Sequence, residues 1–108
     1  MSQEMAGAGK VVEEMIEYLE DSNIIEKGSL ITRLENVLKV IKQNQNKLWL
    51  RTKTGKPVGE ALEDKSQMML GRLIDSQSID EWLESLSDLE TQVHMINEES
   101  RRRSMVVT

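Results

Sequence analysis

Residues 79–96 read IDEWLESLSDLETQVHMI, and this stretch decides the fold. Its apolar side chains recur at alternating intervals of three and four positions, which places them on one stripe of an α-helix. The members of the stripe are Ile79, Trp82, Leu86, Leu89, Val93 and Ile96. Ser78 and Glu81 have the spacing of a capping box, so we expect the helix to begin there. Such a helix has to bury its stripe, which predicts packing against other helices.

A second amphipathic segment runs from Ser29 to about Leu50, with Ser29 as its expected N-cap. Its heptad-like stripe consists of Ile31, Leu34, Leu38, Ile41 and Leu48. Leu30, Val37 and Val40 widen the apolar face. A wide face is typical of a helix with several neighbours in a bundle, rather than of a two-stranded coiled coil.

Two weaker patterns complete the bundle. Residues 9–21 carry one apolar stripe, and residues 60–75 place Leu62, Met69, Leu73 and Ile74 on one side. Residues 51–59 read RTKTGKPVG, whose glycines and proline predict a long loop or hinge. Period-two alternation is absent, so no sheet is expected. The sequence thus predicts an all-α bundle of about four helices in antiparallel hairpins, one domain over 1–99, and a flexible, disordered basic tail over 100–108.

Composition argues against most chemistry. The 108 residues include no Cys and one His, His94, so disulfides, thiolate or multi-His metal sites and Cys nucleophiles are excluded. The segment TGKPVG lacks the spaced glycine and the following Ser or Thr of a phosphate loop. We therefore predict no enzyme activity, cofactor or small-molecule substrate. A nucleotide- or metal-binding enzyme remains a disfavoured alternative.

The absence of long apolar runs predicts no membrane span and no secretory signal peptide. The uninterrupted apolar runs are no longer than three residues, as in residues 48–50. We therefore expect a soluble intracellular protein, either cytoplasmic or nuclear.

Charge is unevenly distributed along the chain. The net charge of −5 resolves into −5 over residues 1–27, +6 over 28–59, −9 over 60–100 and +3 over 101–108. Either the basic centre packs against the acidic segments within the fold, or it stays open for an acidic partner. Direct binding of nucleic acid is disfavoured because the acidic total would repel phosphates.

Part of the chain resembles the helical N-terminal domain of transcription elongation factors of the TFIIS, elongin A and Mediator type. The resemblance rests on a Leu-rich helix, then Thr54, Gly55, Lys56 and Val58 as a turn, then helices leading to Trp82. It covers residues 34–83, lacks the usual Pro-Ile/Met-Thr step, and the family is commonly more basic. It implies an adaptor that binds short disordered motifs, with contacts near Lys56 and Trp82.

The main functional hypothesis is a non-enzymatic protein–protein interaction or oligomerisation module. The two strong stripes would carry the contacts, with Trp82 as an anchor and Trp49 at a separate site beside the loop. If the stripe of residues 79–96 serves only the interior, the chain is a compact monomer; if shared, it is a homodimer or part of a hetero-assembly. Arg101–Arg103 precede Ser104 in the pattern of a basophilic kinase site, which makes Ser104 a candidate phosphosite.

Overall fold

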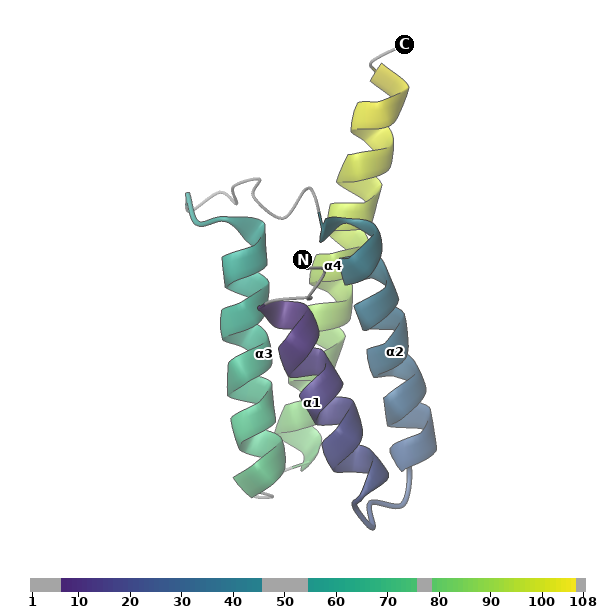
Figure 1. Ribbon diagram of the computed structural model, residues 1–108, viewed down its shortest axis with the longest axis vertical. Helices are drawn as coiled ribbons and strands as arrows, with labels where there is room; N and C mark the ends of the chain where they lie inside the picture. The colour runs from purple at the N-terminus through teal and green to yellow at the C-terminus, as the bar shows by residue number, and fades with distance from the viewer. Residues whose placement is uncertain (1–6, 46–54, 76–78, 107–108) are drawn as a thin grey trace, which may run out of the picture.

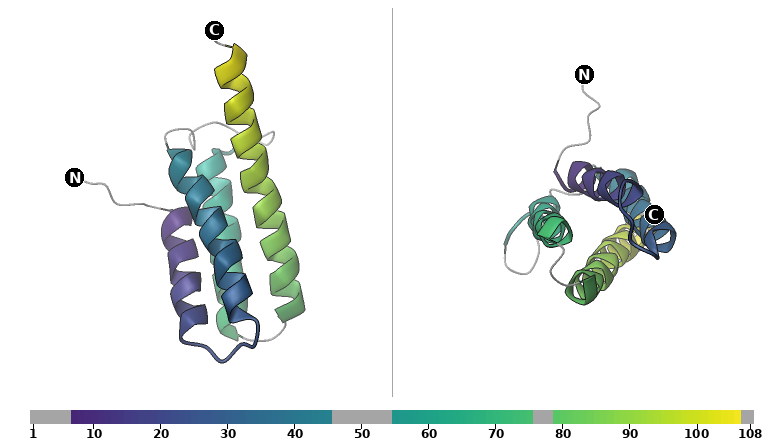
Figure 2. Two further views of the ribbon diagram at one scale, coloured as in Figure 1. Left: turned by 90° about the vertical axis from the view of Figure 1, so that its right-hand side faces the viewer. Right: turned by 90° about the horizontal axis from the view of Figure 1, so that it is seen from below.

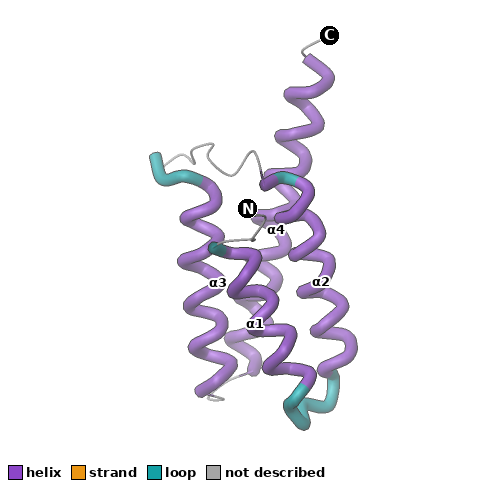
Figure 3. Tube along the Cα trace, in the orientation of Figure 1, coloured by secondary structure: helices purple, strands orange, loops and turns teal. Residues whose placement is uncertain are grey.

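The computed structural model describes residues 7–45, 55–75 and 79–106, with residues 100–106 described by their backbone alone. These residues form four helices: α1 (Ala8–Glu20), α2 (Lys27–Gln43), α3 (Val58–Asp75) and α4 (Ile79–Val106). The described part of the chain contains helices and loops but no strand (Figure 3). The predicted all-α fold of four helices is therefore confirmed.

The helices stand at the corners of a square (Figure 1 and Figure 2). Helix α1 packs against α2 and α3, and α4 packs against the same two helices. The α1–α2 and α3–α4 hairpins are antiparallel, as predicted from their short connections, and the end of α3 and the start of α4 lie at the same end of the bundle as the α1–α2 turn. The end of α2 and the start of α3 occupy diagonal corners at the other end, which explains why a long connection separates them.

All four helices direct their apolar stripes into one core. Trp82, Leu86 and Leu89 of α4 are completely buried, and so is Leu34 of α2. The core also takes in Val12, Met15 and Leu19 from α1 and Leu62, Met69 and Leu73 from α3. Burying large apolar side chains is the main favourable term in folding, so these stripes hold the bundle together.

Helix α2 differs from its predicted bounds at both ends. It begins at Lys27, so Ser29 lies inside the helix instead of capping it, and the N-cap Glu26 makes no side-chain cap bond. It ends at Gln43 rather than continuing to Leu50. The buried Asn44 supplies the stop, because its Nδ2 donates to the Val40 carbonyl at 2.8 Å while its backbone N–H donates to the same helix end. Residues 46–50 lie outside the described residues.

The stripes of α3 and α4 also differ in detail from the prediction. Ile74 was expected on the buried side but is 52% exposed, and the fourth interior position of α3 belongs to Ser66. The spacing explains this exchange, because residues 62, 66, 69 and 73 follow helical periodicity and residue 74 does not. Ile79, the first member of the α4 stripe, is also exposed.

The backbone of α4 continues as a helix to Val106, past the predicted end near residue 100. No Gly or Pro occurs between residues 97 and 106, so nothing in the sequence interrupts the helix there. This last part projects beyond the other three helices (Figure 1).

Candidate protein-interaction surface

The two stripes predicted to carry contacts lie mostly inside the bundle. Leu34 and Ile41 of α2 are buried, as are Trp82, Leu86, Leu89 and Val93 of α4. Ile31, Leu38 and Ile96 are half-buried against the same core. Leu48 and Trp49 lie outside the described residues, so their predicted roles stay predictions. In this fold, the α4 stripe serves the internal core except at its first residue, Ile79, which is exposed.

In the described part of the chain, five large apolar side chains are exposed. They are Ile25, Met68, Ile74, Ile79 and Met95. Ile25 lies in the turn between α1 and α2, Ile74 in the last turn of α3 and Ile79 at the start of α4, and these three segments lie at the same end of the bundle (Figure 1). We call this surface the hairpin end and define it as residues 20–27, 74–75 and 79–81. Met68 and Met95 lie on the sides of α3 and α4.

The α1–α2 turn holds Ile25 outward by a set of local hydrogen bonds. The Ser22 hydroxyl donates to the Leu19 carbonyl at 2.8 Å and accepts from the Ile24 N–H at 3.3 Å. The Ile24 carbonyl in turn accepts from the Lys27 N–H at 3.2 Å. Ile24 consequently packs against the core, while Ile25, one residue further, is 96% exposed.

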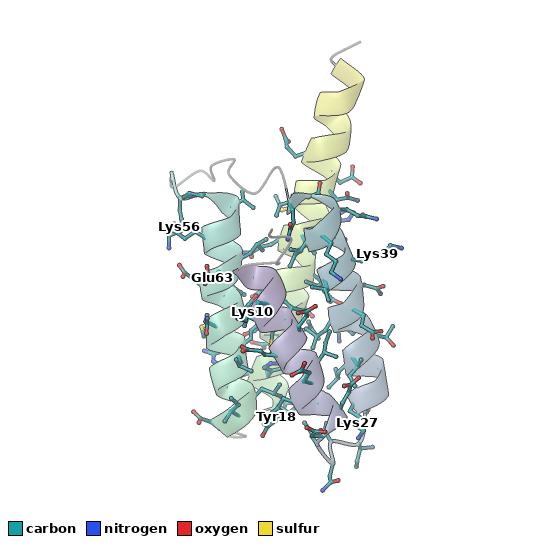
Figure 4. All side chains as sticks on the ribbon, viewed as in Figure 1. Lys10, Tyr18, Lys27, Lys39, Lys56 and Glu63 are labelled. Carbon is teal, nitrogen blue, oxygen red and sulfur yellow. The ribbon has the colours of Figure 1, made fainter. Side chains whose placement is uncertain are left out.

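The hairpin end is strongly acidic. It contains six exposed acids against one base: Glu20, Asp21, Glu26, Asp75, Asp80 and Glu81 against Lys27. The Lys27 ammonium is occupied, because Nζ donates to the backbone carbonyls of Glu20 and Ser22 at 3.0 Å each (Figure 4). The nearest further base, Arg72, donates from Nη1 to the Ser85 hydroxyl at 3.2 Å. Both cationic side chains are therefore engaged in hydrogen bonds within the bundle.

Several of these acids stand at helix C-termini. Glu20 ends α1 and Asp21 is its C-cap, and the last turn of α1 contains no basic residue. Asp75 ends α3, whose last turn also contains the basic residue Arg72. A helix C-terminus carries the negative end of the helix dipole, so acids there add to a negative potential instead of balancing it.

The basic centre of the sequence is neutralised in part within the fold. Arg33 of α2 contacts Glu90 of α4 at 2.7 Å, and Lys56 contacts Asp64 of α3 at 2.6 Å. The hydrogen bond with the partner carboxylate raises the pKa of Arg33 and also that of Lys56. Lys39 and Lys42 are exposed on α2. The structure thus supports internal packing for Arg33 and leaves part of the basic segment on the surface.

Other predicted features of the surface can now be placed. Lys56 is exposed and paired, whereas Trp82 is fully buried, so these two residues do not form a shared peptide-binding surface. His94 is exposed on α4, with its Nε2 3.9 Å from Glu98 Oε2. Ser104 falls in the part of α4 described by its backbone alone, so its modification stays a prediction.

In the described part of the chain, no cluster of three or more His, Cys, Asp or Glu side chains is arranged to hold a metal ion. None of the helices described combines the length and the apolar character needed to cross a membrane.

Comparisons with known proteins give no family assignment. No family model, no curated protein and no solved structure matches this chain. The evidence for a function therefore comes from the surface of the bundle.

The hairpin end was missed at the level of sequence because its residues do not form a periodic pattern. Ile25 is the second isoleucine of a pair in a polar turn, and Ile74 and Ile79 flank another turn. The signal that could have found it is the combination of aliphatic residues and acids at both predicted short turns.

Proposed function

We propose that this chain is a non-enzymatic protein-interaction module that binds its partner through the hairpin end. The observation that carries the proposal is the placement of Ile25, Ile74 and Ile79, exposed at one end of a bundle whose core is closed. Single exposed apolar side chains are ordinary on a protein surface, but a group of aliphatic side chains at one place is typical of a binding site.

The other exposed apolar residues give weaker support to any site. Met68 and Met95 are isolated among polar neighbours on their helices, and flexible methionines are common on surfaces. The buried stripes of α2 and α4 would have to leave the core to contact a partner, which would disrupt the bundle. The hairpin end needs no rearrangement, because its isoleucines are already exposed.

The partner is either a different protein or a second copy of this chain, inside the cell. A surface of this kind suits an adaptor or an assembly subunit, because a few side chains within a polar rim supply most of the binding energy at protein interfaces. Neither role requires the chain to catalyse a reaction.

Photo-crosslinking in the source cells tests the proposal. A photoreactive amino acid replaces Ile25 in one variant and the exposed Glu14, midway along α1, in a matched control. We expect a discrete crosslinked species, with a partner or a second copy, from position 25 and not from position 14. Equal crosslinking at both positions, or none at position 25, would overturn the proposal.

A further inference from the structure

We infer that the hairpin end accepts a basic amphipathic segment of another protein, in which Lys or Arg residues accompany aliphatic anchors. This inference rests on the proposed function and adds the chemistry of the partner. The bundle has an unbalanced charge at the same place where it exposes isoleucines. A segment that supplies cations and apolar side chains together would complement both features.

The charge argument starts from the lack of available cations at this end. The single base of the hairpin end, Lys27, is bound to two backbone carbonyls of the α1 terminus. A partner's Lys or Arg would therefore approach exposed acids such as Glu20, Asp21 and Asp75. Complementary charge of this kind favours the right partner and accelerates association.

The helix termini strengthen the argument. Cationic side chains near a helix C-terminus interact favourably with its dipole and its unpaired carbonyls. Helix α1 has none in its last turn and carries Glu20 and Asp21 instead. Lys27 already binds two carbonyls at this terminus, and a partner's cation would interact with the carboxylates of Glu20 and Asp21 beside it.

The apolar side chains add a second requirement. Charge alone would accept any polycation, but Ile25, Ile74 and Ile79 are useful only to a partner with aliphatic anchors. The chain's own basic segment, residues 101–103, follows the end of the bundle opposite the hairpin end, so it does not cover this surface within one molecule (Figure 1). The occupant is therefore a segment of a second molecule.

Peptide binding measured by fluorescence anisotropy tests the inference. The probe is a labelled amphipathic helix of Lys and Leu, and its two controls are a version with Glu for Lys and a shuffled version that is equally basic but not amphipathic. We expect the full chain to bind the probe, to bind the shuffled peptide about tenfold more weakly, and to ignore the acidic peptide. Equal affinity for the probe and the shuffled peptide would overturn the apolar requirement and with it the inference.

Matched charge reversals locate the binding site. The variant Glu20→Lys/Asp21→Lys/Asp75→Lys changes acids of the hairpin end, and Glu14→Lys/Glu35→Lys/Glu60→Lys changes exposed acids elsewhere by the same net charge. We expect the first variant to lose about tenfold or more in affinity for the probe and the second to lose much less. Equal losses would show that the peptide senses only the overall charge, and the inference would fail. Ile25→Ser/Ile74→Ser is expected to weaken binding without changing the charge.

The failure of this inference is distinguishable from the failure of the proposed function. If position 25 crosslinks to a partner whose contact surface is acidic or uncharged, the interaction module stands and the basic partner does not. If the partner is a second copy bound through residues 101–103, the variant Arg101→Glu/Arg102→Glu/Arg103→Glu abolishes self-association in sedimentation equilibrium. This result would overturn the inference that the partner is another protein. If crosslinking also fails, both proposals are wrong.

Discussion

Arg33 on α2 binds Glu90 on α4 through one edge of its guanidinium group. Its Nε donates to Oε2 at 2.9 Å and its Nη2 donates to Oε1 at 2.7 Å. The pair joins two helices that are not consecutive in the chain, and both side chains are 34% exposed. Bidentate geometry of this kind is more specific than a single contact, so the pair helps to fix how the second hairpin lies on the first.

Breaking this pair should destabilise the bundle slightly. Arg33→Met keeps most of the aliphatic stem and removes the charge, and we expect the free energy of unfolding to fall by about 0.5–1 kcal/mol, less at high salt. Chemical denaturation measures the change. Lys56→Met, which removes the more exposed pair with Asp64, is the control and should have no measurable effect. A larger loss from Lys56→Met would contradict this assignment.

The pH dependence of the Arg33 contribution follows from the direction of its pKa shift. The hydrogen bond to Glu90 raises the pKa of Arg33 above its usual value. Because the pKa of this base is higher in the folded protein than in the unfolded chain, the stabilisation is fully present at pH values below the pKa of the unfolded chain. It is lost only when the pH rises above the pKa of the folded protein. We therefore expect the difference between wild type and Arg33→Met to stay constant from neutral pH to mildly alkaline pH. A difference that shrinks across this range in denaturation curves would contradict the assignment.

Replacing Ser66 by Ala should change the stability of the bundle differently from replacing Ser85 by Ala. Ser66 is buried in α3 and its hydroxyl has no hydrogen-bond partner, whereas the Ser85 hydroxyl accepts from Arg72. Ser66→Ala removes an unsatisfied buried group and adds a better helix former, so we expect a gain of about 1 kcal/mol in the free energy of unfolding. Ser85→Ala should give no such gain. Thermal denaturation of the two variants decides, and a loss of stability for Ser66→Ala would show that its hydroxyl is satisfied.

The first residue of the α4 stripe and a residue near its middle should differ sharply in their contribution to stability. Leu86 is fully buried, and Leu86→Ala should lower the free energy of unfolding by about 2–5 kcal/mol. Ile79 belongs to the same sequence stripe but is 42% exposed, and Ile79→Ala should cost well under half as much. Urea denaturation of both variants provides the comparison. Similar losses would mean that Ile79 is buried in solution, for instance in a dimer.

The acids at the end of α1 should oppose the stability of the bundle. Glu20→Lys replaces an acid by a base at a helix C-terminus, and we expect a gain of about 0.3–1 kcal/mol in the free energy of unfolding at low salt. The gain should shrink as salt screens the dipole. Glu14→Lys, in the middle of the same helix, is the control and should show a smaller effect. A destabilised Glu20→Lys variant would show that this carboxylate has a structural role.

The sequence predicted the core well because core residues obey a period. Trp82, Leu86 and Leu89 were placed on one stripe, and all three are fully buried. In α3, the prediction included Ile74, which follows the buried Leu73, and left out Ser66, which is in register but less hydrophobic. Periodicity identifies the inward face of a helix, and hydrophobicity alone does not.

Helix ends and surfaces were less predictable, since they depend on single contacts. The stop of α2 at Asn44 comes from one side-chain hydrogen bond to Val40, inside a segment whose apolar pattern continues. The hairpin end is assembled from two turns that are about fifty residues apart in the chain, and only the folded bundle brings Ile25 and Ile74 to the same end. No local pattern could indicate that proximity.

The alternating direction of the four helices makes the two ends of the bundle different. The start of α1 and the end of α4 both point away from the hairpin end (Figure 1). A bundle attached through either terminus, to a sensor chip, a bead or a neighbouring domain, would therefore hold the hairpin end outward into the solution. Tethering by the termini is thus compatible with binding at the hairpin end, and the same architecture would let several copies on one scaffold display that end in parallel.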